Sequence, residues 1–308
     1  MVEVGAVVIG NGIISGIVLG TLFSLMALGL TLIFATVRIL NFAHGMFFTL
    51  GEFVVWWLVA PRFTEFGGFE PYASGLLLPF GIAFALGLGA LFVVGVGTER
   101  LLIRPLRKKP GWEMTTLVAT IALATVIESG TLLGFGYKTK KFDPIVEGVL
   151  NIVPGVTITN TEIAQFVIAI GVLIALQAFL RRNRQGLAMR AVSQDTEMGT
   201  LLGVRVNTTY LYAFAISAVL AALAGILLSN VLLIDSTVGT VPMLKAFIII
   251  IFGGIGSVTG TLYAAFILGF IESFTALFIG LAWALPVEFA VMVIVLAIRP
   301  QGLFGFKE

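Results

Sequence analysis

Few residues of this 308-residue chain could do chemistry, and three of them lie in one short stretch. The segment "RILNFAHGMFFTLGEF" contains Asn41, Glu52 and His44, and His44 is the only histidine of the chain. A zinc site needs three or four ligands, and the chain has no cysteine that could join this histidine. We therefore predict no catalytic residue, no metal site and no cofactor-binding residue.

The same stretch has two interpretations as an element of structure. Gly45 and Gly51, after Asn41, interrupt helix continuity, and freed backbone groups at membrane depth persist only inside protein or beside a water-filled cavity. The first interpretation is a broken helix beside a translocation path, with the histidine and the glutamate as polar lining. The second is an interfacial turn whose polar groups are wetted by headgroups, with Arg38 reaching the surface. The sequence leaves both open.

A second glycine-rich segment, "FGGIGSVTG", contains Gly253, Gly254 and Gly256. Glycine-interrupted apolar segments at corresponding places in two halves of a chain indicate inverted repeats and a pathway at the membrane midplane. We therefore count these glycines as a second candidate helix break on the path.

Composition indicates the elements that must position these residues. Hydrophobic residues make up 59% of the chain and charged residues only 11%, against about 25% charged residues in soluble proteins. Apolar runs of roughly 20 residues, the length that crosses a bilayer, recur throughout. We predict an all-α, polytopic membrane protein, one domain over residues 1–308, with eight or nine crossings and at least one broken or re-entrant helix. The expected spans are 7–34, 43–60, 74–97, 115–136, 163–180, 208–231, 241–256, 258–279 and 284–299.

Basic residues predict how these spans are oriented. The segments "TERLLIRPLRKKPGWE" and "RRNRQGLAMRAVSQDTEMGTLLGVRVN" hold five lysines and arginines each, ten of the eighteen in the chain. The positive-inside rule places both in the cytoplasm and the N-terminus outside. The first residues lack a basic leader, so we interpret them as part of the first span and not as a cleaved signal peptide. Residues 61–75 and 137–162 then lie outside, the latter as a surface cap, and the segment from Arg299 onward lies inside.

The second basic segment, residues 181–207, contains the pattern of a short helix. Ser193 or Asp195 could cap it, Glu197 would lie in its first turn and Gly203 could end it. Apolar residues at positions 198, 201 and 202 have helical spacing. The alternative is a solvated basic linker.

Several stretches resemble the branched-chain amino-acid ABC transporter permease family. "EMGTLLG" has the E-x-x-x-x-x-G spacing of the EAA loop of importer permeases, although Met198 and Gly199 replace its two alanines. "GLTLIFATVRILNFAHGMFFTLGEF", "LAGILL", "LKAFIIIIFGGIGSVTG" and "RPQGLFG" are similar to that family in order and spacing. The similarity covers essentially the whole chain.

The resemblance implies an importer subunit of a bacterial or archaeal plasma membrane that works with other proteins. Its expected partners are a second homologous permease, two cytoplasmic ATPases and an extracytoplasmic solute-binding protein, with no nucleic acid. ATP would be bound by the ATPases, and this chain has no G-x-x-x-x-G-K-[ST] run of its own. The residues that the resemblance assigns to ATPase coupling are Arg190, Asp195, Glu197, Gly199 and Gly203.

Other functions remain open on the sequence. The carried solute could be a branched-chain or other small hydrophobic amino acid, or urea or an amide. An ion-coupled secondary transporter would use membrane carboxylates such as Glu52 or Glu272, and a structural subunit would transport nothing. Polar residues inside spans usually face a bundle interior or a cavity. The others of this kind that we single out are Glu128, Ser129, Gln165, Gln177, Ser273 and Glu288.

Overall fold

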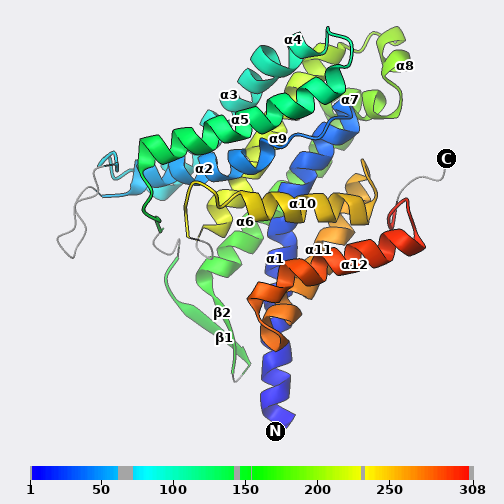
Figure 1. Ribbon diagram of the computed structural model, residues 1–308. Coiled ribbons are helices and arrows are strands. Elements are labelled where there is room, and N and C mark those ends of the chain that lie inside the picture. Colours follow the sequence, from blue (N-terminus) through cyan, green and yellow to red (C-terminus); the bar gives the residue numbers. More distant parts are fainter. Residues whose placement is uncertain (1, 62–71, 142–145, 154, 230–232, 305–308) are drawn as a thin grey trace.

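The computed structural model describes residues 2–61, 72–141, 146–153, 155–229 and 233–304, and these residues are mostly helical (Figure 1). The helices are α1 (Val2–Val37), α2 (His44–Val59), α3 (Phe80–Gly97), α4 (Arg104–Leu106), α5 (Trp112–Phe135), α6 (Asn160–Arg182), α7 (Arg184–Gln194), α8 (Thr196–Leu201), α9 (Val206–Leu228), α10 (Thr240–Gly253), α11 (Val258–Phe278) and α12 (Ala284–Ile298).

Seven helical segments within the described residues are long and apolar enough to cross a membrane. Two more apolar helices are shorter, α2 with 16 residues and α10 with 14. At about 1.5 Å per residue they cover roughly 24 Å and 21 Å, less than the roughly 30 Å of a hydrocarbon core. The predicted polytopic all-α fold is confirmed.

Helix α1 forms the centre of the molecule and packs against α9 and α11 (Figure 1). Gly12, Gly16 and Gly20 lie one turn apart along α1 and face α11. A β-carbon at Gly20 would lie 2.8 Å from the α-carbon of Phe266, so only glycine allows this approach. Small residues at such spacing let membrane helices pack backbone to backbone. The helices α3, α5, α6 and α12 are more exposed and surround this core.

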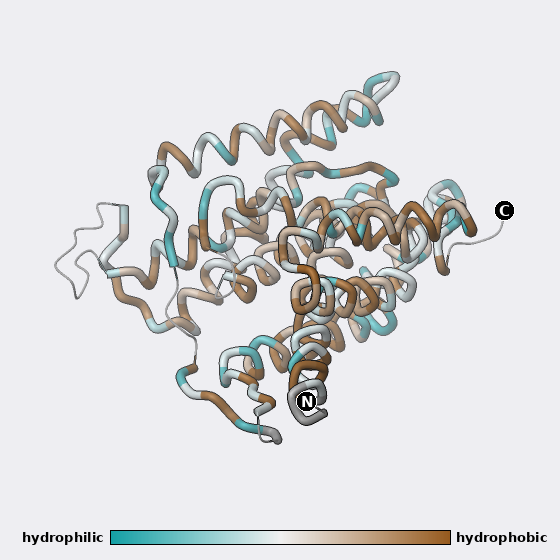
Figure 2. Tube along the Cα trace, turned by 60° about the horizontal axis from the view of Figure 1, so that its bottom comes forward, coloured by the Kyte–Doolittle hydropathy of each residue, from teal (hydrophilic) through white to brown (hydrophobic). Residues whose placement is uncertain are grey.

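Figure 2 shows that apolar residues run along the helices, while hydrophilic residues gather at loops and helix ends. Both basic segments lie at one end of the molecule, which we call the basic end and define by residues 98–113 and 181–207. The start of α1 lies at the opposite end, where Asn11 contacts the backbone of Gly155 and Thr157. The predicted placement of the N-terminus opposite to both basic segments agrees with this arrangement.

The expected surface cap, residues 137–162, contains the strands β1 (Val149–Val153) and β2 (Val156–Thr159). They pair antiparallel, with Val149 opposite Thr159, and β2 leads into the first turn of α6. The Thr159 hydroxyl accepts a hydrogen bond from the Glu162 amide, and the Glu162 carboxylate accepts one from the Thr159 amide, a capping box. This hairpin is an addition to the predicted all-α fold. The expected external loop at 61–75 lies largely outside the described residues.

The predicted start of the third span, residue 74, is wrong, whereas its predicted end agrees with the end of α3 at Gly97. The helix begins at Phe80 and not at residue 74, because Pro79, with no amide hydrogen and a fixed φ, suits the position just before a helix. Its helical path continues past residue 97 through a π-helical segment, Thr98–Ile103, into α4. Much of the first basic segment is therefore helix and not loop.

Candidate functional site

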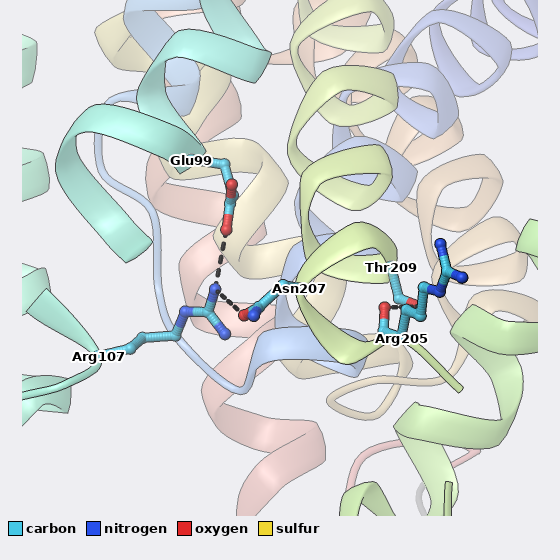
Figure 3. Close-up of polar contacts among 5 residues, drawn as sticks. All are labelled: Glu99, Arg107, Arg205, Asn207 and Thr209. Atoms are coloured by element: carbon cyan, nitrogen blue, oxygen red, sulfur yellow. Dashed lines mark hydrogen bonds and ion pairs between the residues drawn. The ribbon is translucent and has the colours of Figure 1, made fainter. Parts of the chain in front are cut away.

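The two basic segments are joined to each other through Arg107, which follows α4 (Figure 3). Its Nη2 donates hydrogen bonds to Glu99 Oε1 at 2.8 Å and to Asn207 Oδ1 at 3.3 Å. Its guanidinium also lies over the ring of Tyr210, 4.3 Å from the centroid. Burial lowers the pKa of Arg107 and the Glu99 carboxylate opposes that shift, but an arginine still stays charged at neutral pH. This contact ties the first basic segment to the start of α9.

The second basic segment holds two helices where the sequence predicted one. Helix α7 begins after Asn183, whose side-chain oxygen accepts a hydrogen bond from the Gln185 amide at 2.9 Å. Met189 and Val192 are buried on the inner face of α7. A β-carbon at Gly186 would lie 2.1 Å from the carbonyl oxygen of Phe179, so α7 turns back closely against the end of α6. The sequence did not predict α7, because packing of its buried face against other helices stabilises this charged helix.

Helix α8 is the short helix that the sequence predicted, and Asp195 is its cap. The Asp195 carboxylate accepts hydrogen bonds from the amides of Glu197 and Met198 at 2.8 Å and 3.0 Å. Ser193, the alternative cap, lies inside α7 and donates to the carbonyl of Arg190 instead.

Helix α8 also ends as the sequence predicted, just before Gly203. Gly203 has a φ of 82°, and its amide donates to the carbonyl of Thr200 at 3.0 Å. The Val204 amide donates to the carbonyl of Gly199, also at 3.0 Å. Together these two bonds form a Schellman motif, which normally uses glycine at the left-handed position. Both ends of α8 are therefore fixed by local hydrogen bonds.

The outer face of α8 is apolar and exposed. Leu201 and Leu202 are each 81% exposed and Met198 is 58% exposed. Glu197 is exposed beside them, whereas Gly199 is buried against α7. An exposed apolar cluster on a polar loop is typical of a surface that contacts another protein.

A cavity of about 990 Å³ lies at the basic end beside α7. Arg190 lines it together with Arg38 at the end of α1 and Gly256 in the turn before α11. Ser193 and Gln301 lie at the same cavity. Arg190, predicted for ATPase coupling, and Gly256, predicted for the second helix break, therefore line the same positively charged opening.

The stretch from Arg38 to His44 is a true break between helices, in which Asn41 and His44 are buried and Arg38 is exposed. Asn41 Oδ1 accepts a hydrogen bond from the Ala43 amide at 3.2 Å. His44 is fully buried between α1 and α9, with Nε2 2.9 Å from the carbonyl oxygen of Met26 and Nδ1 3.1 Å from the hydroxyl of Ser217. Within this chain, His44 therefore connects two core helices and is not wetted at a surface.

Gly45 and Gly51 do not interrupt the helix, and this part of the prediction is wrong. Helix α2 is continuous from His44 to Val59. Both glycines instead permit contact: a β-carbon at Gly51 would lie 2.6 Å from that of Ala222 in α9, and one at Gly45 would lie 2.6 Å from the carbonyl oxygen of Gly239.

The contact between Gly45 and Gly239 joins the N-terminal ends of α2 and α10. The Gly239 amide donates to the Thr49 hydroxyl at 3.0 Å, which fixes the entry of α10 against α2. Gly45 therefore lies against Gly239, which is in the turn before α10 and not in the glycine segment from Gly253 to Gly256.

Gly253, Gly254 and Gly256 form the predicted second break. Helix α10 ends at Gly253, and a β-carbon there would lie 2.5 Å from the carbonyl oxygen of Gly260. Gly254 and Gly256 have φ values of 101° and 82°. The chain therefore reverses sharply into α11, at the basic end where α1 also terminates.

Carboxylates inside the bundle have two kinds of surroundings. Glu52 is fully buried next to Gly225 of α9, and neither carboxylate oxygen has a hydrogen-bond partner among the described residues. Glu272 forms an ion pair with Lys245 of α10, and Glu288 Oε1 lies 3.9 Å from the same Lys245 Nζ. The ammonium group also lies 4.9 Å from the ring centroid of Phe23. We call Lys245, Glu272 and Glu288 the charged triad.

Sequence reasoning missed Lys245, although a lysine in the apolar run "VPMLKAFIIIIF" is itself a signal of a functional or paired group. Other predicted polar residues have structural partners. Gln165 donates to the carbonyl of Leu227, and Ser273 donates to that of Gly12. Glu128 is half-buried and Ser129 is exposed on α5.

Comparison with known proteins decides the family. Residues 12–296 match the family described as "Branched-chain amino acid transport system / permease component". The chain belongs to this permease family.

Individual relatives cover the permease over nearly its whole length. It is 29% identical to the high-affinity branched-chain amino acid transport system permease protein BraD of Pseudomonas aeruginosa, over 96% of this chain and 95% of that protein. It is 27% identical to the corresponding protein LivH of Escherichia coli, over 96% and 94%. It is 28% identical to a probable branched-chain amino acid permease LivH of Methanocaldococcus jannaschii, over 94% and 90%. No solved structure gives a significant match.

Family and fold together define the general role of this permease. It is a transport subunit of an ATP-binding-cassette system and a multi-pass protein of the plasma membrane. The positive-inside rule predicts that its basic end faces the cytoplasm.

Proposed function

We propose that this permease imports branched-chain or other small hydrophobic amino acids and that α8 couples it to partner ATPases. The observation that carries this proposal is the exposed apolar face of α8, which is held rigidly at the basic end. Exposing Leu201 and Leu202 to water is unfavourable for a loop that contacts no other protein, whereas a docking partner would bury both side chains.

The connections of α8 support a lever that moves core helices. Val192 of α7 is buried in a cluster with Tyr210 and Phe214 of α9 and Ile33 of α1. Arg107 adds a polar clamp to the first turn of α9. Because closely packed interiors transmit displacement, a push on α8 would move α7, α9 and α1 together.

The partners in this proposal are a second, similar permease, two cytoplasmic ATPases that bind the ATP, and an extracytoplasmic solute-binding protein. The solute would cross between the two permeases. An apolar path suits an aliphatic side chain, because burying it leaves no polar partner unsatisfied. The names of the relatives support this substrate class.

The test replaces Leu201 with glutamate in the assembled importer, reconstituted with its ATPases and binding protein. Burial of a leucine contributes about 1.5–3 kcal/mol, so we expect docking to weaken by roughly 10- to 100-fold and uptake to fall accordingly. Glu197→Lys and Gly203→Leu should also uncouple ATP hydrolysis from uptake while the protein still inserts.

Thr200→Glu is the matched control, since position 200 is exposed, points about 100° around the same helix from Leu201 and receives the same charge. Uptake and stimulated ATP hydrolysis at wild-type levels in Leu201→Glu and Glu197→Lys would remove α8 from the coupling mechanism. A further measurement, uptake by this chain alone under a proton or sodium gradient, would reveal an ion-coupled transporter.

A further inference from the structure

An apolar groove of about 590 Å³, to which the proposed coupling mechanism assigns no residue, lies between α1, α6 and α11. Leu28, Leu173, Leu176, Leu262 and Phe266 line it. Its volume falls within the range of about 300–1,000 Å³ that is typical of sites for small ligands. Most of its lining residues are apolar, and the polar ones are Gln177, Arg181 and Arg182 in the last turns of α6 and Thr259 in the first turn of α11.

The position of α6 determines what surrounds this groove. Helix α6 is mostly exposed, and Ile174 on its groove side is 64% exposed. In a membrane protein such a surface faces hydrocarbon, so lipid acyl chains are the molecules that surround this groove and can enter it. An aqueous solute would find few hydrogen-bond partners along these walls.

The polar end of the groove carries two arginines. Arg181 and Arg182 are both exposed and line the groove at the last turn of α6. Neither forms an ion pair with a carboxylate within the part of the chain that the structure describes. With the Gln177 amide turned so that its oxygen faces Arg181, it accepts hydrogen bonds from Nε at 3.0 Å and Nη2 at 2.8 Å, which orients that guanidinium.

We propose that this groove binds one anionic phospholipid of the inner leaflet, with an acyl chain along α6 and α11 and the phosphate at Arg181 and Arg182. The charge complementarity is direct, because planar guanidinium groups pair bidentately with phosphate oxygens. Basic pockets between helices at the cytoplasmic side of a membrane are recognised sites for anionic headgroups. The apolar walls and the cationic end therefore fit the two halves of the same molecule.

The site lies directly before the turn between α6 and α7, and α7 leads on to α8. Arg182 precedes Asn183, the cap of α7, and Gly186 then packs against the Phe179 carbonyl oxygen. A phosphate held at the end of α6 would restrain this turn between α6 and α7. The lipid would thus support the orientation of α7 independently of which solute is carried.

The experiment measures lipid binding to the purified full chain by native mass spectrometry, with phosphatidylglycerol and phosphatidylcholine as probes. We expect one phosphatidylglycerol to be retained in preference to phosphatidylcholine. The variant Arg181→Gln/Arg182→Gln should weaken phosphatidylglycerol binding by about thirtyfold, the contribution of two basic residues near an anionic surface. Ala178→Trp, which fills the groove, should release both lipids.

The matched control is Lys108→Gln/Arg184→Gln, which removes two exposed charges of the basic end that do not line the groove. Equal loss in this control, or equal binding of the two lipids by the wild type, would overturn the site. Displacement of the lipid by inorganic phosphate would overturn the role of the acyl chain. Loss of the bound lipid when the second permease joins, with cysteine at position 174 crosslinking to it, would assign the groove to the subunit interface instead.

Discussion

Replacing Lys245 with methionine tests whether one buried cation neutralises two membrane carboxylates. The ammonium group of Lys245 pairs with Glu272 of α11 and lies 3.9 Å from Glu288 Oε1 of α12. The three side chains are only 11%, 8% and 1% exposed. Methionine keeps an unbranched apolar chain of similar length and removes only the charge.

The structure gives the size of the effect. Two opposite charges 3.9 Å apart attract by about 4 kcal/mol at an effective dielectric constant of about 20. Removing one partner of a buried ion pair costs about 3–5 kcal/mol in measured cases. We expect Lys245→Met to lower the free energy of unfolding by about 3–5 kcal/mol.

Neutralising either carboxylate should lower the free energy of unfolding by less than removing the lysine does. Glu272→Gln removes one ion pair but leaves Lys245 beside Glu288, so its cost should be smaller. Glu288 has no hydrogen bond to either carboxylate oxygen among the described residues. Glu288→Gln should therefore change stability by less than about 1 kcal/mol, because it removes a buried charge that is only partly compensated.

The assay is unfolding in mixed micelles, in which the folded fraction is followed as the proportion of denaturing detergent rises. Lys108→Met is the control, since this lysine is exposed and the substitution should cost less than about 0.5 kcal/mol. A Lys245→Met protein as stable as the control, or less affected than Glu288→Gln, would refute the assignment of Lys245 as the shared cation.

Two further predictions concern backbone contacts. Gly239→Ala should destabilise the protein by about 1–3 kcal/mol in the same assay, because its β-carbon would lie 1.9 Å from the Gly45 carbonyl oxygen. Gly171→Ala, where nothing lies within 4 Å of the added carbon, should be neutral or stabilising, and equal effects would contradict the packing argument. Asp195→Ala should cost about 1 kcal/mol of α8 stability and speed amide exchange at Glu197 and Met198, while Asp195→Asn should not. Unchanged exchange in Asp195→Ala would show that the cap does not hold α8.

Features governed by local rules could be predicted from the sequence. Long apolar runs predicted where the membrane-spanning helices lie, because a crossing needs about 20 hydrophobic residues. Asp195, one of the two candidate caps, and Gly203 marked the ends of α8, because capping depends on residues within one turn. The same rules missed α7, since its stability comes from burying Met189 and Val192 against other helices.

Predictions about the break before α2 failed where the contacts are distant in sequence. Gly45 resembles a helix breaker, but it lies against Gly239, 194 residues away, and a side chain at position 45 would collide with that backbone. Lys245 and Glu272 similarly belong to different helices, so neither residue reveals the pair by itself. The placement of His44 between Met26 and Ser217 also depends on three separate segments.

Helices α2 and α10 illustrate why these distant contacts matter to the fold. The chain enters α2 from the basic end, through residues 38–43, and enters α10 from the opposite end, where Ile234 pairs with Lys140 after α5. Neither helix is long enough to span the hydrocarbon alone, so a crossing through either one would include non-helical backbone. Such backbone is tolerated at membrane depth only inside protein or beside water. The meeting of the two helix starts at Gly45 and Gly239, with Thr49 bonded to the Gly239 amide, places these irregular segments inside the bundle. The short helices therefore depend on each other, and a substitution that separates them should disturb both crossings at once.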